Sequence, residues 1–545
     1  MNWETVYQSS LAKIFPDRTP DEPCLKTLPA WGGERVHFQT AFRPDFSWGK
    51  VEVKTVSKLA GYIRLRSVEA VPVDYLPPKY DADSVYHKPG LYPDLLRDLE
   101  NNSFSTVFNQ WRSIWVTIDV PEDLPAGEYP LTVEFHAFDI VSKTSAVFSG
   151  PEMTVQIMAK KLPAQTLKNT HWFHCDSIAD YYKVEIFSEE HWRLIGNFMR
   201  AASACGINMI LTPVITPPLD TEVGSARPVV QLVDIFRRNG RWSFDFSKLE
   251  RWCRLAQECG ISYFESAHLF TQWGAKCTPK IMAECDGAIK QIAGWDLPAD
   301  SPEYEDFLSS FLPALTGWID ANGLREKFYF HCSDEPHTED CEMYGKDFAL
   351  IQKYLSGMKI FDALSRPEIY EATGKKTIPV ICEYRLCDFE GVKLPERWTY
   401  YCCEPFADYP NRFIYMQSWR NRILGALLYR YDMEGFLHWG FNFYYSRLCR
   451  FKVNPYCNTT AGGSFPAGDG FIVYPGEDGK VEFSLRAEVF YDALQDMRCL
   501  QQLEAEFGRE KVCAFIDSYA ANGTLSMTDF AVDPKFFSDL RTWNG

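Results

Sequence analysis

The chain has 545 residues, 46% hydrophobic and 24% charged, which describes an ordinary globular protein too long for a single hydrophobic core. The net charge of −17 disfavours nucleic acid and anionic membrane surfaces as partners, so a neutral substrate fits better. We expect no signal peptide and no membrane span, because no basic segment precedes an apolar one and no apolar run is long enough. The 17 cysteines follow no framework spacing, which favours free thiols and predicts a cytoplasmic protein.

The first 163 residues are predicted to form an all-β sandwich. Short β-branched or aromatic runs with partial alternation mark its strands. They lie at residues 35–42, 50–56, 61–68 and 111–120, and a Pro/Gly turn joins two further strands within 120–135. A series of short strands with tight turns closes most naturally as two packed sheets.

Residues 164–480 are predicted to form a (β/α)8 TIM barrel, because strands and helices alternate along this stretch. The predicted strands are 171–175, 207–211, 261–267, 328–333, 378–382, 399–403, 435–440 and 470–474. The predicted helices are 188–205, 249–259, 307–321 and 412–431. The link between residues 382 and 399 is too short for a full helix, so one βα unit is expected to be degenerate. Residues 481–545 are predicted to add a long C-terminal helix, 483–507, and a tail packed on the barrel.

Catalytic residues of such barrels lie at the carboxyl ends of the strands, so position along the chain predicts role. Polar and aromatic side chains cluster at these ends, and we expect them to line one site. They are His174, Asp176, Glu265, His268, Gln272, Trp273, Asp334, Glu335, Glu383, Tyr384, Trp439 and Asn442. A cluster of this composition is typical of a sugar-binding site.

Asp334 and Glu335 are the most informative residues of the chain. They stand side by side at the end of a buried aromatic strand and are followed by Pro336. Burial disfavours the charge of both carboxyls, and each raises the pKa of the other. Such a pair supplies one proton donor and one fixed negative charge, which is what cleavage of a glycosidic bond requires. The pair therefore predicts a glycoside hydrolase.

Two other chemistries are weighed against this one. His171 and His174, with His331 and Asp334, make a conceivable set of metal ligands, but their spacing matches no ligand signature. Cys332 beside the acids is a conceivable nucleophile, although the sequence names no base to activate it. Hydrogen-bonded histidines and a buried structural thiol are the simpler interpretations, and no metal or cofactor is expected.

Several stretches of the chain resemble glycoside hydrolase family 123, the β-N-acetylgalactosaminidases. The stretches occur in the expected order and span most of the chain. They are Leu-Thr-Pro-Val-Ile-Thr-Pro-Pro-Leu-Asp-Thr at 211–221, His-Leu-Phe-Thr-Gln-Trp-Gly-Ala-Lys at 268–276, Ser-Asp-Glu-Pro at 333–336, Gly-Phe-Leu-His-Trp-Gly-Phe-Asn at 435–442, Gly-Asp-Gly-Phe-Ile-Val-Tyr-Pro-Gly at 468–476 and Ser-Leu-Arg at 484–486.

This resemblance implies retaining, substrate-assisted hydrolysis, in which the 2-acetamido oxygen of the sugar attacks the anomeric carbon and forms an oxazolinium intermediate. It implies that Asp334 orients the acetamido N–H and that Glu335 protonates the leaving oxygen. Tyr384 is the expected partner of the acetamido carbonyl, with Tyr401 and Tyr445 as alternatives. The resemblance also implies that the sugar ring and hydroxyls are bound by Trp439, Asn442, Gln272, Trp273, Glu265 and His174.

The sequence thus predicts an exo-acting hydrolase for glycans that end in β-N-acetylgalactosamine. Two alternatives stay open, which are the same chemistry on N-acetylglucosamine or another 2-acetamido sugar, and a carbohydrate-binding barrel without turnover. A metal-dependent hydrolase is a third. The native glycan and linkage cannot be inferred from sequence, and neither can the oligomeric state, a homo-oligomer included.

Overall fold

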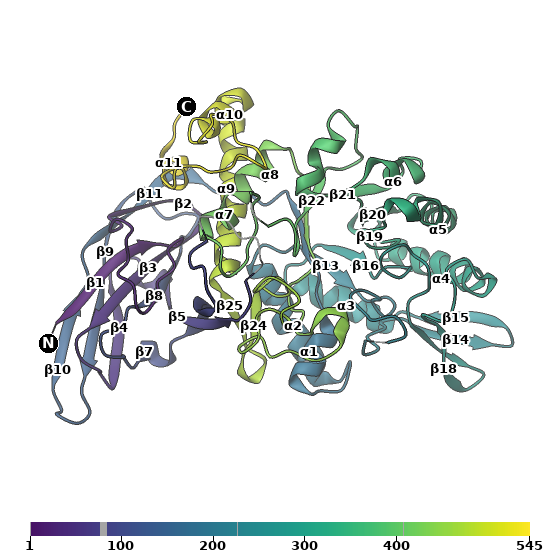
Figure 1. Cartoon of the computed structure of the whole chain (residues 1–545), viewed down its shortest axis with the longest axis horizontal. Coiled ribbons are helices and arrows are strands. Elements are labelled where there is room, and N and C mark those ends of the chain that lie inside the picture. Colours follow the sequence, from purple (N-terminus) through teal and green to yellow (C-terminus); the bar gives the residue numbers. More distant parts are fainter. Residues whose placement is uncertain (1, 77–83, 226, 407) are drawn as a thin grey trace.

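A computed structural model describes residues 2–76, 84–225, 227–406 and 408–545. Its N-terminal part consists of two β-sheets (Figure 1). The first has the strand order β1-β3-β8-β5-β6-β25-β24, and the second has the order β2-β11-β9-β4-β7 with β10 paired to β9. The strands are β1 (Trp3–Ser9), β2 (Thr27–Gly32), β3 (Arg35–Pro44), β4 (Lys50–Val56), β5 (Ile63–Val73), β6 (Gly90–Asp98), β7 (Ser103–Phe104), β8 (Arg112–Asp119), β9 (Gly127–Phe138), β10 (Ser145–Ser149), β11 (Met153–Lys161), β24 (Val473–Pro475) and β25 (Val481–Ser484).

Alternating apolar residues of the two sheets pack against each other. Phe38 of β3 and Val116 of β8 meet Val53 of β4, Phe135 of β9 and Ile157 of β11 in one buried cluster. Successive side chains of a strand point to opposite faces, so each strand supplies every second residue to this core. The strands predicted at 35–42, 50–56, 61–68 and 111–120 overlap β3, β4, β5 and β8.

The next part of the chain is a closed barrel of eight parallel strands. The strands are β12 (Lys168–His171), β13 (Met209–Thr212), β16 (Tyr263–Ser266), β19 (Phe328–Phe330), β20 (Lys359–Ala363), β21 (Ile378–Cys382), β22 (Trp398–Tyr400) and β23 (Gly435–His438). Met209, Tyr329, Phe361, Trp398 and Leu437 pack together in the interior. The barrel is therefore filled by side chains, and a substrate can bind only at an end.

Helices connect most of the barrel strands. They are α1 (Cys175–Tyr182), α2 (Glu189–Ala204), α3 (Ser247–Glu258), α4 (Pro302–Ala321), α5 (Cys341–Tyr354), α6 (Pro367–Ala372), α7 (Ser418–Arg422) and α8 (Leu424–Arg430). Between β21 and β22 the structure has only a 3-10 segment, Glu383–Phe389, where the sequence predicted a shortened unit. A separate sheet, β15-β14-β17-β18, lies within the connections on either side of β16. Its strands are β14 (Asp234–Arg238), β15 (Arg241–Asp245), β17 (Ile281–Cys285) and β18 (Ala288–Ala293).

Three predicted elements of the barrel are wrong. Residues 470–474 do not close it, because β24 pairs with β25 and joins the first N-terminal sheet. The fifth barrel strand is instead β20, which the prediction omitted. The single helix predicted at 412–431 is two short helices, α7 and α8, and starts only at Ser418. In addition β12 ends at His171, earlier than predicted, so His174 lies on the loop that follows.

The C-terminal helices α9 (Leu485–Phe507), α10 (Arg509–Asp517) and α11 (Phe536–Thr542) complete the chain. In Figure 1 α9 lies between the N-terminal sheets and the barrel. It contacts both sides: Phe490 packs edge-on against His171 of β12, and Glu488 pairs at 2.5 Å with Arg66 of β5. None of the helices in the described residues is long and apolar enough to cross a bilayer. The sheets and the barrel thus share α9, which fixes the base on which the site is built.

Candidate active site

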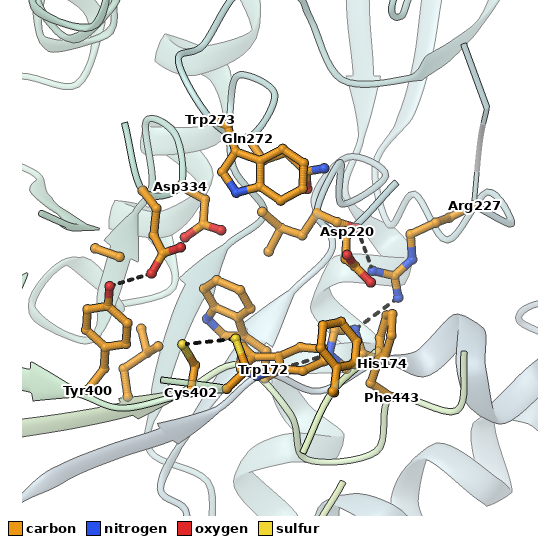
Figure 2. Close-up of a pocket in the computed structure, with 17 residues that line it drawn as sticks. Trp172, His174, Asp220, Arg227, Gln272, Trp273, Asp334, Tyr400, Cys402 and Phe443 are labelled. Carbon is orange, nitrogen blue, oxygen red and sulfur yellow. Dashed lines mark hydrogen bonds between the residues drawn. The ribbon is translucent and has the colours of Figure 1, made fainter. Parts of the chain in front are cut away.

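A pocket of about 670 Å³, its open mouth included, lies at the carboxyl ends of the barrel strands (Figure 2). This volume is in the range of small-molecule sites, and this end of a barrel is where loops gather catalytic groups. The pocket is lined by Trp172, His174, Leu219, Asp220, Arg227, Gln272, Trp273, Asp334, Glu335, Ala363, Tyr400, Cys402, Cys403, Leu437, Trp439, Phe443 and Phe465. Six residues expected at the site are among them: Asp334, Glu335, His174, Gln272, Trp273 and Trp439.

Asp334 and Glu335 both open into this pocket because the backbone turns sharply between them. Neighbouring side chains of a regular strand point to opposite faces. Glu335 has a φ of 42°, in the left-handed region that non-glycine residues seldom adopt, and the following Pro336 ends the extended segment. The backbone N–H of Trp273 donates to the carbonyl of Asp334 at 2.9 Å and holds the turn. The local strain is the cost of aiming two adjacent acids into one space.

The two carboxyls share a dry environment that keeps protons on them. Burial is the largest cause raising the pKa of Asp334, and the charge of Glu335 adds to it. Burial also raises the pKa of Glu335, while a hydrogen bond from Tyr400 acts in the opposite direction. Two acids this close titrate as a pair, so the first proton lost is shared between them and the second is retained to higher pH. The pocket can therefore present one acid and one base together.

A buried row of charged residues lies in the barrel next to this pair. His331, on the same segment as the acids, bonds Glu265 through Nε2 at 2.9 Å and Asp362 through Nδ1 at 3.1 Å. Burial opposes a charged ring, but the hydrogen bonds to both carboxylates outweigh it and raise the pKa of His331 to about 9. The imidazolium in turn lowers the pKa of Asp334, against the larger effect of burial. His331 thus places a positive charge near the acid pair.

Asp362 also fixes the backbone that leads to the acids. Its two oxygens accept from the backbone N–H of Cys332 at 3.0 and 3.1 Å, and the Tyr344 hydroxyl donates to it at 2.6 Å. Asp362 is the fourth residue of β20, the strand that the sequence analysis omitted. The position of Asp334 two residues beyond Cys332 is therefore set by a side chain from the neighbouring strand.

The opposite end of the pocket is held by an ion pair. Arg227 bonds both oxygens of Asp176 at 2.8 Å, and it donates to Nδ1 of His174 at 3.0 Å. Burial, then the charge of Arg227, lower the pKa of His174 to about 3, so this ring is neutral. Asn442 brackets the backbone of His174, accepting from its N–H at 2.9 Å and donating to its carbonyl at 3.1 Å. Arg227, Asp220 and His174 lie together at this end in Figure 2.

Trp439 forms part of the wall between the two ends. Its indole N–H donates to Asp469 at 3.0 Å, and the rings of Phe443 and Phe465 lie edge-on to it, each with its centroid 5.0 Å away. Burial raises the pKa of Asp469 to about 7. On the other side of the pocket the Gln272 amide donates to the carbonyl of Thr221 at 3.2 Å. A fixed indole face opposite an amide suits the apolar face and the hydroxyls of a sugar.

Three of the expected sugar-binding residues do not line the pocket. Glu265 is fully buried and is occupied by His331 and by the hydroxyl of Thr170. Asn442 is also fully buried and holds the His174 backbone. Tyr384 lines a separate cavity beside the 3-10 segment. These residues act on the pocket through others or lie outside it.

Tyr400, Asp220 and Arg227 line the pocket but were not among the expected residues. Tyr400 is the last residue of β22 and donates its hydroxyl to Glu335. The adjacent Tyr401, which the sequence analysis did consider, packs against Phe436. Period-2 alternation along β22 separates the two tyrosines, and this signal would have found Tyr400 once the strand boundary was known. Arg227 carries no sequence signal because it lies on a long loop.

The histidines do not form the metal site that the sequence left open. Nδ1 of His171 faces Arg412 at 3.1 Å, and both nitrogens of His174 are already bonded. One group in the described residues has metal-ligand spacing, namely His268, His331 and Asp362. Both nitrogens of His331 bond carboxylates there, so the ring has no free lone pair to offer a cation. This arrangement fits the residues better as a hydrogen-bonded network.

A pair of acids at the mouth of a filled barrel, with aromatic walls and neutral polar partners, defines a carbohydrate-active site of the hydrolase type. The comparisons agree with this class. The model of the glycoside hydrolase 123 catalytic domain matches residues 172–503. No curated protein sequence matches the chain.

Two solved structures illustrate the similarity in fold. A family 123 glycoside hydrolase from Clostridium perfringens, described in a study of glycolipid glycan hydrolysis, is similar with a TM-score of 0.72 and 15% identity, covering 99% of this chain and 96% of that one. A β-glucuronidase from Parabacteroides merdae gives a TM-score of 0.26 and 12% identity, covering 81% of this chain and 46% of that one. The family match covers more than half of the chain, and the chain belongs to glycoside hydrolase family 123.

Proposed function

We propose that this glycoside hydrolase removes terminal β-N-acetylgalactosamine with retention, using the acetamido group of the substrate as nucleophile. The observation that carries the proposal is the opening of adjacent Asp334 and Glu335 into one pocket through a left-handed backbone turn. A protein nucleophile and an acid normally stand about 5 Å apart on opposite sides of the bond. Adjacent acids on one side suit a substrate whose acetamido nitrogen and glycosidic oxygen are neighbours on the ring.

In this mechanism Asp334 accepts the acetamido N–H and Glu335 donates a proton to the leaving oxygen. In the free pocket the hydrogen bond from Tyr400 favours an ionised Glu335, which is the wrong state for an acid. An acetamido N–H donated to Asp334 favours ionised Asp334. Because the pair shares protons, that bond moves the remaining proton to Glu335. Substrates that carry an acetamido group would thus prepare their own general acid.

The proposal assigns the tyrosine of the acid site to Tyr400, since Tyr384 lies outside the pocket lining. Trp439 would stack on the sugar ring, and His174, Gln272 and Trp273 would contact its hydroxyls. Glu265 and Asn442 would act as positioning residues through His331 and His174. The fold of this site we infer to be a (β/α)8 barrel with one degenerate unit after β21.

A cytoplasmic location and the domain limits at residues 163 and 480 stay predictions. All 17 cysteines are free thiols, which supports a reducing compartment. The source of substrate would then be imported oligosaccharides.

The proposal is tested by release of nitrophenol from paired β-glycosides of N-acetylgalactosamine, N-acetylglucosamine and galactose. We expect fast release from the first, slower release from the second and none from the third. Faster release from the N-acetylglucosamine glycoside would keep the mechanism and change the substrate. Binding of N-acetylgalactosamine without any product would favour a carbohydrate-binding barrel.

Substitution of the acids separates their roles. Asp334→Asn and Glu335→Gln are each expected to lower kcat by at least about a hundredfold, the usual scale for one acid–base group. Both substitutions are close to isosteric, so the melting temperature should stay near that of the wild type. A substrate with a good leaving group needs little protonation, and it should rescue Glu335→Gln but not Asp334→Asn. Near-wild-type rates from either variant on the unactivated glycoside would contradict the assignment.

A further inference from the structure

Two adjacent cysteines line the acid end of the pocket, and the proposed hydrolysis gives them no role. Cys402 and Cys403 follow β22 directly, so they stand one loop turn from Tyr400, which bonds Glu335. Both are partly exposed, and their sulfurs lie 3.9 Å apart (Figure 2). The chain contains one such pair of consecutive cysteines. Two accessible thiols at this separation can act together on one ligand atom.

The loop that carries the pair is fixed by a buried side chain. The Asn411 amide donates to the carbonyl of Cys402 at 3.0 Å and to that of Pro405 at 2.9 Å. The backbone N–H of Cys402 donates to the carbonyl of Glu404 at 2.9 Å. Asn411 itself is fully buried. The two sulfurs are therefore presented to the pocket by an ordered loop, and little rearrangement is needed to engage both.

The sulfur separation matches the geometry of a tetrahedral thiolate site. A Zn²⁺–sulfur bond is about 2.3 Å long, so two sulfurs on one tetrahedral centre lie about 3.8 Å apart. The observed value is 3.9 Å. A disulfide would need the sulfurs to approach to about 2.05 Å, which the present spacing does not favour. The pair is arranged to share a cation rather than to bond each other.

We propose that Cys402 and Cys403 form a two-thiolate site for a thiophilic cation of the Zn²⁺ and Cd²⁺ class, and that the bound cation blocks the sugar site. Binding forms two metal–sulfur bonds and releases the two thiol protons. The other coordination positions are left to water, because no third histidine, cysteine or carboxylate ligand of suitable spacing accompanies the pair in the described residues. Blocking follows because Glu335 and Tyr400 line the same space.

The blocking part of the proposal rests on the proposed function, whereas the binding part does not. A hydrogen bond from Cys403, then burial, raise the pKa of the Cys402 thiol, so the cation must displace a firmly held proton. Affinity should therefore rise with pH. Hard cations such as Mg²⁺ prefer oxygen ligands and are expected not to bind here.

The binding test is a titration of the full chain with Cd²⁺, followed by the ultraviolet absorption of the cadmium–thiolate bond. We expect the wild type to bind one Cd²⁺ tightly through two sulfurs. Cys402→Ser and Cys403→Ser should each weaken this binding at least about tenfold, since loss of even an outer partner of a ligand costs that much. Cys387→Ser, which removes an exposed thiol elsewhere, should bind as the wild type does. Unchanged affinity in both pocket variants would overturn the site.

A second measurement needs no substitution. Phenylarsine oxide joins two thiols to one arsenic atom and releases one water, so it should add once to the wild type and abolish the tight Cd²⁺ absorption. Undiminished Cd²⁺ binding after complete reaction at Cys402 and Cys403 would also overturn the site.

The blocking test compares, for each variant, the rate of glycoside hydrolysis with and without Cd²⁺. We expect Cd²⁺ to inhibit the wild type in competition with the substrate, and Cys403→Ser to resist it at least about tenfold. Binding of Cd²⁺ at the pair without any loss of rate would overturn blocking. A wild type that hydrolyses no glycoside would instead refute the proposed function, and the absorption titration would still decide the cation site.

Discussion

Removal of the Tyr400 hydroxyl tests the acid pair most sharply. In Tyr400→Phe, Glu335 loses the hydrogen bond that favours its ionised form, so its pKa rises further. A hydrogen bond to a charged group contributes about 1.5–3 kcal/mol. Since one pKa unit equals about 1.36 kcal/mol, the shift should be about one to two units. A general acid must be protonated to act, so the variant should stay active to higher pH.

The assay is the pH dependence of kcat/KM, which reports the free enzyme. We expect the basic limb of the profile to move up by about one to two pH units in Tyr400→Phe. The control is Tyr401→Phe, because the Tyr401 hydroxyl is buried without a hydrogen-bond partner among the described residues and the ring faces away from the pocket. A basic limb that stays in place, or that moves equally in the control, would refute the role of Glu335 as the acid.

Three further predictions concern the wall, the buried network and the domain contact. Trp439→Ala should raise KM about tenfold with a smaller change in kcat, because stacking of roughly 1.4 kcal/mol acts on ground and transition states alike; an unchanged KM would contradict it. In histidine nitrogen NMR His331 should remain an imidazolium at pH 8, since its pKa is raised to about 9, and Glu265→Gln should lower that pKa; a ring already neutral at pH 7 in the wild type would contradict the network. Glu488→Gln leaves Arg66 buried without its partner and should cost about 3–5 kcal/mol in urea unfolding; the Glu488 pKa is lowered to about 2, burial being outweighed by Arg66, so the stabilisation it gives is present above its ordinary pKa and is lost as pH falls through about 2, and a cost below about 1 kcal/mol at neutral pH would contradict this.

Much of the barrel was predictable from sequence because its strands are short apolar runs that end in polar residues. Residues 378–382 and 435–440, for example, coincide with or contain β21 and β23. Residues 470–474 have the same appearance, yet they end in the N-terminal sheet. The sheet that a strand joins depends on its partner far along the chain, and a local pattern holds no information on that partner. The omission of β20 has a different cause, since it carries the polar Asp362 in its interior.

Within the site, adjacency in sequence made Asp334 and Glu335 predictable, but the layers around them were not. Glu265 ends a strand as predicted, yet its carboxylate is consumed by His331, a residue more than 60 positions away. Tyr400 could not be chosen over Tyr401 without the strand boundary, because one residue of register exchanges the two faces. Pairing partners and register therefore limit what sequence alone can assign.

The central claim is that the acetamido group of the substrate is the nucleophile. The most direct test compares kcat/KM for nitrophenyl β-glycosides of galactosamine whose N-acetyl group carries zero, one, two or three fluorine atoms. Fluorine withdraws electrons from the carbonyl oxygen, so each atom should lower the rate steeply if that oxygen attacks the anomeric carbon. A rate that is independent of fluorination would contradict the account and point to a nucleophile supplied by the protein, for which Asp220 is the remaining carboxylate of the pocket lining.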